Sequence, residues 1–282
     1  MQIFREIAPL RAFLVEKRRS GQTVGFVPTM GALHPGHLSL IEASKRENAI
    51  TVCSIFVNPA QFNNPDDLKK YPRTLEADQS LLEKAGCNVL FFPETKTMYE
   101  SESKVRFDFG DLDKVMEGKF RPGHFSGVAL VVSKLFHIVE PDTAYFGQKD
   151  WQQLTIIQHL VSELKFNLKL KSIPTLREPD GLAMSSRNTR LSAVQRKKAT
   201  VLYRALHEAR QWLTQSMGVD EVKKKVQQLL ENDNEVKLEY FEIADSVNLK
   251  LLNRVDESDR PILCIAALVG EVRLIDNMFL YP

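Results

Sequence analysis

The residues of this chain most suited to chemistry are two histidines three positions apart, where a buried strand leads into a helix. Residues 28–37 read Pro-Thr-Met-Gly-Ala-Leu-His-Pro-Gly-His, between the apolar run 23–27 and a helical pattern that starts at Leu38. Free N–H groups and the positive end of the helix dipole converge at such a turn, which favours phosphate. His34 and His37 share one face and could donate hydrogen bonds to that phosphate. The alternative is that one of them only caps the helix.

Two further loops carry polar side chains. Asn58 and Gln61 lie in Phe-Val-Asn-Pro-Ala-Gln-Phe at the end of another apolar run, and uncharged groups of this kind suit a small substrate with hydroxyl and carboxylate groups. A plain turn explains the same string equally well. The segment 118–125 is glycine-rich and basic. Its Arg121 could clamp phosphate oxygens, or the segment could be a flexible surface loop.

A fourth site is split along the chain. Residues 146–153 end a strand and start a helix, with Lys149 as a point charge and Gln153 one turn on. Thirty residues later, 180–188 reads Asp-Gly-Leu-Ala-Met-Ser-Ser-Arg-Asn, whose two hydroxyls and guanidinium could wrap a triphosphate. By itself such a turn is more often a capped surface loop.

These loops must be positioned by a regular framework. Helices are expected at 9–20, 38–48, 74–85, 125–139 and 150–164, and strands at 23–28, 50–57, 89–92, 143–146 and 168–173. This alternation predicts an α/β fold with a doubly wound parallel sheet and helices on both faces. Ligands of such sheets bind at the carboxyl ends of the strands, where the polar loops lie.

The pattern changes after about residue 175. We expect one long helix at 192–217, a second at 219–232, and half-buried strands at 237–243, 261–269 and 272–280. The sequence Val-Gly-Glu-Val at 269–272 is typical of a tight hairpin. The prediction is therefore a Rossmann-like domain over 1–175 and a smaller α+β domain with an antiparallel sheet over 176–282.

Composition excludes several classes of protein. The 282 residues are 43% hydrophobic and 26% charged, with a net charge of +2, so nucleic acid is not expected as a partner. A membrane is not expected either, because the longest nearly apolar stretch, 127–139, is too short and too polar to span a bilayer. Cys53, Cys87 and Cys264 lie far apart in apolar runs and are expected to be reduced core residues. The N-terminus lacks the apolar core of a signal peptide, and we expect a cytoplasmic protein.

Together the strings resemble the pantothenate synthetase (pantoate–β-alanine ligase) family over nearly the whole chain. The matching motifs occur in family order: PTMGALH-x-GH at 28–37, FVNP-x-QF at 56–62, YPRT at 71–74, G-x-FRPGHF-x-GV at 118–128, FGQKD at 146–150, REPDGLAMSSRN at 177–188 and RLIDN at 273–277. The resemblance implies a Rossmann-like sheet of the H-x-G-H adenylyltransferase type and a C-terminal lid. It implies that ATP, pantoate and β-alanine give pantothenate, AMP and pyrophosphate through a pantoyl adenylate.

The family motifs imply roles for individual residues. His37 matches the family's proton donor, and His34, Lys149 and Arg187 would act with it in catalysis. ATP would be bound by Met30, Gly31, Ala32, Leu33, His34, Pro35, Gly36, His37, Gly147, Gln148, Lys149, Asp150, Leu176, Met184, Ser185, Ser186 and Arg187. Gln61 would contact pantoate and β-alanine and Gln153 pantoate, with Asn58 and Arg121 as further substrate-binding candidates.

The resemblance also implies Mg²⁺ with the triphosphate and a homodimer. Asp78 matches a family carboxylate near the ion, acting through water. Phosphates supply many of the ligands of magnesium, so a dedicated protein cage is not needed. Two positions depart from the family pattern: Pro35 stands where many members have Glu, and Ser126 where Asp is usual.

Two other functions compete with the ligase. A nucleotidylyltransferase on the same scaffold would join AMP to a phosphorylated acceptor, but the loop of Asn58 and Gln61 contains no Arg or Lys to hold a phosphate. A nucleotide sensor without catalysis is the other alternative. Three of the six histidines, His34, His37 and His124, lie in the candidate loops, which argues against a sensor.

Overall fold

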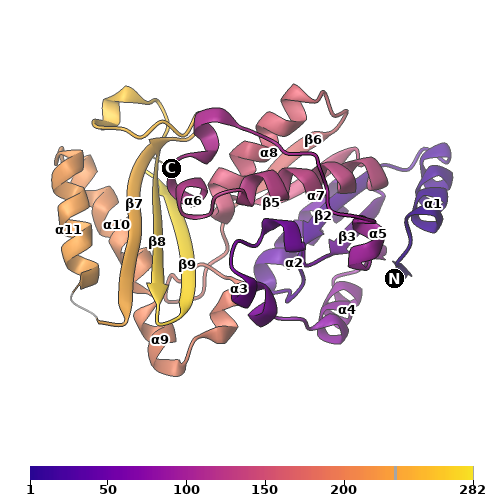
Figure 1. The fold of residues 1–282 in the computed structure, drawn as a ribbon, viewed down its shortest axis with the longest axis horizontal. Helices are drawn as coiled ribbons and strands as arrows, with labels where there is room; N and C mark the ends of the chain where they lie inside the picture. Colours follow the sequence, from indigo (N-terminus) through magenta and orange to yellow (C-terminus); the bar gives the residue numbers. More distant parts are fainter. Residues whose placement is uncertain (232–233, 282) are drawn as a thin grey trace. The chain divides into compact units, whose positions relative to one another are not determined.

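The protein is described by a computed structural model that covers residues 1–231 and 234–281 (Figure 1). The described residues form two compact units. The first contains Met1–Phe109, Arg121–Gln148 and Ile156–Pro174, and the second contains Gly110–Phe120, Lys149–Thr155 and the chain from Thr175 onward. Two short segments that precede residue 175 therefore pack with the C-terminal part of the chain.

The first unit is built on a six-stranded sheet in which every neighbouring pair is parallel. Its strand order is β1-β4-β3-β2-β5-β6. The bounds are β1 Gln2–Phe4, β2 Val24–Thr29, β3 Ile50–Ile55, β4 Val89–Phe91, β5 Thr143–Gly147 and β6 Lys169–Ile173. All six residues of β3 are buried, as expected for a central strand covered on both faces. The predicted α/β class is confirmed.

Helices cover both faces of this sheet (Figure 1). The helices of the first unit are α1 Ile7–Arg19, α2 Pro35–Glu47, α3 Pro65–Lys70, α4 Leu75–Lys84, α5 Thr95–Met98 and α7 His124–Val139, and most of α8 Trp151–Glu163. Successive side chains of a strand point to opposite faces. Accordingly, Phe26 of β2 packs edge-on against Phe136 of α7, whereas Val27 joins an apolar cluster with Leu40 and Ile41 of α2.

The strand order reverses beside β2. This strand pairs with β3 on one side and β5 on the other, so the loops that leave β2, β3 and β5 open at one carboxyl edge of the sheet. Doubly wound sheets bind their ligands at this switch point. The loops concerned are the ones that hold residues 30–34, residues 56–61 and Gln148.

The second unit contains a three-stranded antiparallel sheet with the order β7-β8-β9. Its elements are α6 Met116–Phe120, α9 Ala193–Lys198, α10 Val201–Thr214, α11 Val219–Glu231, β7 Val236–Asp245, β8 Pro261–Val269 and β9 Val272–Phe279. Apolar side chains of α10 and α11 pack with the strands in one core. Gly270, with φ +58°, turns the tight hairpin between β8 and β9, as the sequence predicts.

Some predicted bounds differ from the observed ones. The expected single helix at 192–217 is wrong: α9 and α10 are separate, because the N–H groups of Thr200 and Leu202 bond to carbonyls three residues back rather than four. The helix after the histidine turn starts at Pro35, not Leu38, and β7 is longer than 237–243. Strand β1 is absent from the predicted elements. The expected end of the second helix, Asn232, lies outside the described residues.

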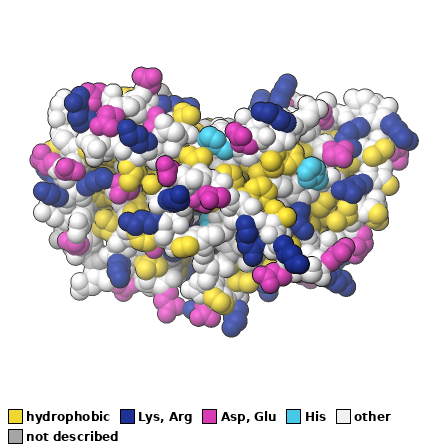
Figure 2. All heavy atoms as spheres, turned by 45° about the horizontal axis from the view of Figure 1, so that its top comes forward, with side chains coloured by type: hydrophobic (Ala, Val, Ile, Leu, Met, Phe, Trp, Pro, Cys, Tyr) yellow, Lys and Arg dark blue, Asp and Glu magenta, His cyan; other side chains and the backbone are white. Residues whose placement is uncertain are grey.

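Basic and acidic side chains are interspersed over the face of the molecule drawn in Figure 2. Cys53, Cys87 and Cys264 are free, buried thiols. Within the described residues, no helix combines the length and apolar character that crossing a bilayer requires.

Candidate active site

The histidine turn begins with two left-handed residues after β2. Gly31 and Ala32 have φ values of +80° and +49°, a region that Gly adopts freely and other residues rarely. His34 is then the N-cap residue of α2 and Pro35 its first residue. Proline is favoured at this first position because its φ is already helical and its missing N–H would have no helical acceptor. The departure from Glu at Pro35 therefore fits the local structure.

The carboxylate of Asp78 holds this turn in place. Its Oδ2 accepts the N–H of Ala32 at 2.9 Å and its Oδ1 accepts the N–H of Leu33 at 2.8 Å. Thr74 also donates to Oδ1 at 3.2 Å, and the Asp78 residue is only 1% exposed. Both oxygens are thus occupied by protein donors. This geometry makes Asp78 a support of the histidine turn.

The two histidine rings lie against one another, with centroids 4.0 Å apart. The backbone N–H of His34 donates to Nδ1 of His37 at 3.3 Å. A backbone N–H can only donate, so Nδ1 of His37 acts as an acceptor and the proton of the neutral ring is on Nε2. The capping contact therefore does not compete with a function in phosphate binding. Nε2–H is the donor that His37 can present to a ligand.

Asn58 and Gln61 come together after β3. The amide of Asn58 donates to Gln61 Oε1 and to the Gly127 carbonyl, both at 3.1 Å. Its oxygen accepts from Ala60 N–H at 3.3 Å and from the Tyr99 hydroxyl at 2.7 Å. Burial raises the pKa of Tyr99 to about 12, so the hydroxyl stays protonated.

The four hydrogen bonds of the Asn58 amide use both of its N–H donors and both acceptor sites of its oxygen. The residue is also only 1% exposed. Asn58 is therefore built to orient Gln61 and offers no free group to a substrate. The amide nitrogen of Gln61 points to the sulfur of Met30 at 3.0 Å. Thioether sulfur is a weak acceptor, so an oxygen of a small acid is the better partner for this amide. Met30 and Gln61, predicted from separate motifs, are thus adjacent.

His124 and Arg121 support Gln61 from behind. Nη1 of Arg121 lies 3.1 Å from Nε2 of His124, and Nδ1 of His124 lies 2.8 Å from the Gln61 carbonyl. Guanidinium only donates, so Nε2 accepts and Nδ1–H donates to the carbonyl. Arg121 Nη2 also reaches the Gln61 carbonyl at 3.4 Å. This structure gives both residues a role in placing the backbone of Gln61.

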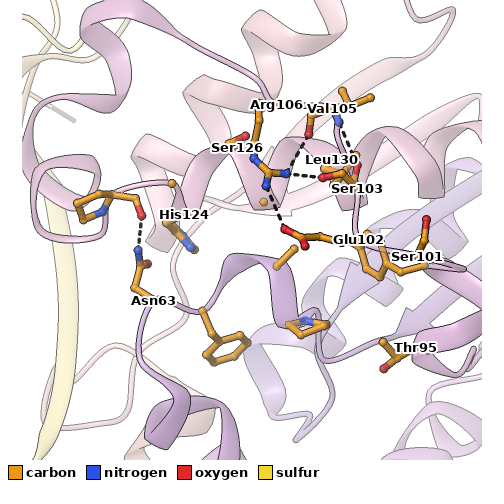
Figure 3. A pocket seen from close by; sticks show the side chains of 17 residues that line it. Asn63, Thr95, Ser101, Glu102, Ser103, Val105, Arg106, His124, Ser126 and Leu130 are labelled. Atoms are coloured by element: carbon orange, nitrogen blue, oxygen red, sulfur yellow. Dashed lines mark hydrogen bonds and ion pairs between the residues drawn. The ribbon is translucent and has the colours of Figure 1, made fainter.

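A cavity of about 740 Å³ borders this cluster, lined by the 59–63 turn, the 99–106 segment and the start of α7 (Figure 3). Several of its polar side chains already have protein partners: Arg106 pairs with Glu102, and Asn63 donates to the Pro122 carbonyl. Ser126, the second departure from the family pattern, accepts the N–H of Phe107 at 2.9 Å. Its hydroxyl therefore anchors the segment that forms one wall.

The predicted residues after β5 are divided between the two units. Gly147 and Gln148 belong to the first, where Gln148 donates to Ser172 Oγ at 3.1 Å. Lys149, Asp150 and Gln153 belong to the second. Nζ of Lys149 lies 3.8 Å from Asp150, and Gln153 is in the first turn of α8.

The 176–188 region forms a short hairpin followed by a single 3₁₀ turn. Met184 N–H bonds to the Leu176 carbonyl at 3.0 Å and Glu178 N–H to the Leu182 carbonyl at 2.9 Å. The Arg196 guanidinium beside Asp180 lowers the pKa of that carboxyl, and it binds both oxygens at 2.8 and 3.0 Å. The predicted ATP-binding residues Ser185, Ser186 and Arg187 lie immediately after this fixed hairpin, where Ser185 Oγ accepts the N–H of Arg187.

A buried charge cluster holds α6 within the second unit. Both oxygens of Glu117 accept from Arg273 at 2.7 Å, and one also accepts from the Tyr240 hydroxyl at 2.9 Å. Burial, with the nearby Glu117 carboxylate, raises the pKa of Tyr240 well above its usual value, so the hydroxyl remains a donor. Glu117 N–H is bonded to Gln152 at 2.9 Å. Sequence reasoning missed Glu117 and Tyr240. Glu117 directly precedes the 118–128 motif, whereas Tyr240 lies in no motif of the sequence.

The described residues provide no ready-made metal cage. Across 1–231 and 234–281, no group of three or more His, Cys, Asp or Glu is placed to hold an ion. Asp78, the predicted contact near the metal, uses both oxygens on backbone N–H groups. The side chains thus fit a magnesium ion only if the phosphates of a nucleotide carry it.

Comparisons with known proteins show which family this chain belongs to. A sequence profile of the family described as Pantoate-beta-alanine ligase matches residues 2–279. The pantothenate synthetase of Cytophaga hutchinsonii is 48% identical over 273 residues, 96% of each chain. That of Bacteroides thetaiotaomicron is 48% identical over 278 residues, covering 99% of this chain and 98% of the relative.

Solved structures extend the likeness to the fold. The pantothenate synthetase of Thermus thermophilus superposes with a TM-score of 0.93 at 43% identity, over the full length of both chains. The pantoate-beta-alanine ligase of Francisella tularensis, complexed with β-γ ATP and β-alanine, has a TM-score of 0.83 at 37% identity, over 100% of this chain and 98% of that one. The chain belongs to the pantoate–β-alanine ligase family.

Proposed function

We propose that this protein joins pantoate to β-alanine at the expense of ATP. In the first half-reaction a carboxylate oxygen of pantoate attacks the α-phosphorus of ATP, and the bond to pyrophosphate breaks. In the second, the amine of β-alanine attacks the acyl carbon of the pantoyl adenylate, loses a proton and displaces AMP. Both steps rely on positioning and on stabilising charge, without a covalent protein nucleophile.

The observation that carries this proposal is the pair of imidazoles at the start of α2, beside the point where the strand order reverses. Their position combines the helix N-terminus with ring N–H donors. In this proposal Nε2–H of His37 donates to a phosphate oxygen that gains charge as pyrophosphate leaves, and His34 contributes beside it. Lys149 and Arg187 supply positive charge to the same phosphates.

The ATP-binding set is proposed in full from the family motifs. It consists of Met30, Gly31, Ala32, Leu33, His34, Pro35, Gly36 and His37, then Gly147, Gln148, Lys149 and Asp150, and finally Leu176, Met184, Ser185, Ser186 and Arg187. The left-handed turn at Gly31 and Ala32 supports the first group, because it brings backbone to the helix start without a bulky side chain at Gly31.

Gln61 is proposed to bind pantoate and β-alanine, and Gln153 to bind pantoate. The support for Gln61 is its amide, held by Asn58 and directed at the weak acceptor Met30. A neutral amide favours a carboxylic acid over a phosphorylated acceptor, which supports the ligase over a nucleotidylyltransferase. Asn58 and Arg121 are proposed to act through Gln61.

Further properties belong to the same proposal. Mg²⁺ would arrive with the triphosphate and neutralise part of its charge, and the enzyme would work in the cytoplasm as a homodimer. That the second unit closes as a lid over an adenylate stays a prediction.

Isotope exchange tests the first half-reaction directly. The protein is incubated with ATP, Mg²⁺ and labelled pyrophosphate, with and without pantoate, in the absence of β-alanine. Label should enter ATP only when pantoate is present, and β-alanine should then give pantothenate and AMP in equal amounts. Absence of exchange, or exchange that ignores pantoate, would contradict the proposal.

A further inference from the structure

Strand β9 contains the family motif Arg-Leu-Ile-Asp-Asn at 273–277. The reaction described above gives the polar residues of this motif no role. Two of them, Asp276 and Asn277, are 4% and 7% exposed. A buried carboxylate and a buried amide need specific partners. Asp276 is bonded to Arg177 of the hairpin that precedes one candidate ATP-binding segment, and Asn277 is bonded to Lys149 of another.

Asp276 holds the hairpin that precedes the Met184–Arg187 turn. Nη1 and Nη2 of Arg177 bind its two oxygens at 2.6 and 3.0 Å, a bidentate geometry that fixes direction as well as distance. The same guanidinium donates to the carbonyls of Gly181 and Asn277, both at 3.1 Å, and lies 4.7 Å from the centroid of the Tyr203 ring. The hairpin is therefore tied to β9 through one side chain.

Asn277 holds the segment that carries Lys149. Its amide donates to the Lys149 carbonyl at 2.7 Å, which fixes the backbone from which the lysine side chain extends. Lys149, Ser185 and Asp276 also line one small cavity in this unit. The two ATP-binding segments, separated by more than thirty residues along the chain, thus share one wall formed by β9.

We propose that Asp276 and Asn277 are positioning residues for ATP, which set the Lys149 backbone and the Met184–Arg187 turn at a fixed spacing. This inference rests on the proposed function of the enzyme. It assigns the motif of β9 to nucleotide binding through other residues, without direct contact. A purely structural role would instead affect stability and every substrate alike.

Asn277→Ala tests the inference with the least disturbance, because it removes one amide and keeps the Arg177–Asp276 pair. Loss of one buried hydrogen bond corresponds to roughly a ten-fold effect on an equilibrium. We therefore expect the KM for ATP to rise roughly ten-fold, with the KM for pantoate changed by less than about two-fold. The dissociation constant of ATP, measured by calorimetry without pantoate, should rise in parallel.

A matched variant controls for loss of an asparagine in the same unit. Asn248 is exposed, and its side chain bonds locally, accepting the N–H of Lys250 at 2.9 Å. Asn248→Ala should leave both KM values unchanged. Asn277→Asp keeps the shape but replaces the donor by an acceptor facing the Lys149 carbonyl, and it should weaken ATP binding at least as much as Asn277→Ala.

The Arg177–Asp276 pair needs a variant whose effect on ATP can be distinguished from its effect on stability. Replacing both residues by leucine avoids an unpaired buried charge, but the carbonyls of Gly181 and Asn277 lose their donor. For this double variant we expect a lower thermal unfolding midpoint, a raised KM for ATP and an unchanged KM for pantoate. The wild-type exchange assay is the reference: if it shows no pantoate-dependent exchange, the proposed function fails.

With an active wild type, two results would overturn the inference and leave the function standing. One is an unchanged ATP affinity in Asn277→Ala and in the double leucine variant. The other is an equal rise in both KM values together with a lower unfolding midpoint, which is the signature of general destabilisation.

Discussion

The backbone N–H of Leu33 donates a 2.8 Å hydrogen bond to the carboxylate of Asp78, 45 residues further along the chain. With the adjacent bond from Ala32, this contact ties the start of α4 to the turn that carries the two histidines. The turn includes Ala32 in the left-handed region, which a residue other than glycine would rarely populate in a free chain. Asp78 is therefore what keeps the imidazoles at the helix start.

Asp78→Ala should destabilise the protein and impair ATP use. Two buried N–H groups would lose their acceptor, which lowers the free energy of unfolding by about 2 kcal/mol or more. Asp78→Asn keeps one acceptor oxygen and should be milder. If Asp78 only supports the histidine turn, the Mg²⁺ concentration that gives half the maximal rate at saturating ATP should be the same in Asp78→Ala, Asp78→Asn and wild type. A raised Mg²⁺ requirement in Asp78→Asn would instead support the metal contact predicted from the sequence.

Variants of His37 can separate its capping bond from its donor. His37→Ala should reduce adenylate formation about 100- to 1000-fold, the usual result of removing one donor to developing charge. Asn at this position preserves an acceptor near the place of Nδ1, whereas Gln preserves a donor near the place of Nε2. In pyrophosphate exchange His37→Gln should thus be more active than His37→Asn.

A His37→Asn enzyme with wild-type exchange would show that Nε2 has no role. His207→Ala, at an exposed position in α10, serves as control.

Gly127→Ala should reverse the normal preference of a helix. Alanine usually stabilises a helix by up to about 1 kcal/mol over glycine. At Gly127, however, a Cβ would lie 2.1 Å from the Ala60 carbonyl oxygen and 2.8 Å from the Gln61 nitrogen. The 58–61 turn would have to move. We expect a loss of about 1–3 kcal/mol in unfolding free energy and a higher KM for pantoate.

The control for this variant is Gly218→Ala, where an added Cβ meets no atom within 4 Å. It should change neither stability nor KM appreciably. If Gly127→Ala is as stable and as active as Gly218→Ala, the close approach of α7 to the Gln61 turn does not constrain the site.

Local sequence determines much of this fold. The apolar β8 is predicted with its observed bounds, because an apolar run beside a glycine turn has a clear pattern. Its predicted half-burial is wrong, since eight of its nine residues are buried. The predicted start of α2 is three residues late, since Pro and Gly usually mark a loop and here Pro35 is the first helical residue. The break between α9 and α10 depends on local hydrogen bonds three residues back, which apolar periodicity does not reveal.

The candidate site, like the fold, is predictable only where its signals are local. Histidine spacing and glycine turns predict where phosphate chemistry belongs, since those signals are local. The supports of the site are not local: Tyr99 holds Asn58 from 41 residues away, and Asp276 holds Arg177 from 99 residues away. Such pairs depend on which strands become neighbours, and a single sequence contains no periodic signal for them.

The pH dependence of stability should contain a contribution from Glu47 at the end of α2. Hydrogen bonds from Lys171 and Tyr145, both 2.7 Å, lower the pKa of this carboxyl from 4.5. The folded state therefore binds the ionised form better than the unfolded chain does. This contribution is fully present above pH 4.5 and is lost as the pH falls through the lowered pKa.

Glu47→Gln should accordingly lower the midpoint of thermal unfolding slightly at pH 7, and the difference from wild type should shrink as the pH falls below 4.5. Scanning calorimetry at a series of pH values measures this gap. The control is Glu42→Gln, which removes an exposed carboxylate from the same helix. Its difference from wild type in unfolding midpoint should not shrink in the way described for Glu47→Gln. A Glu47→Gln gap that stays constant from neutral to acid pH would mean that ionisation of Glu47 adds nothing to stability through the Lys171 and Tyr145 bonds.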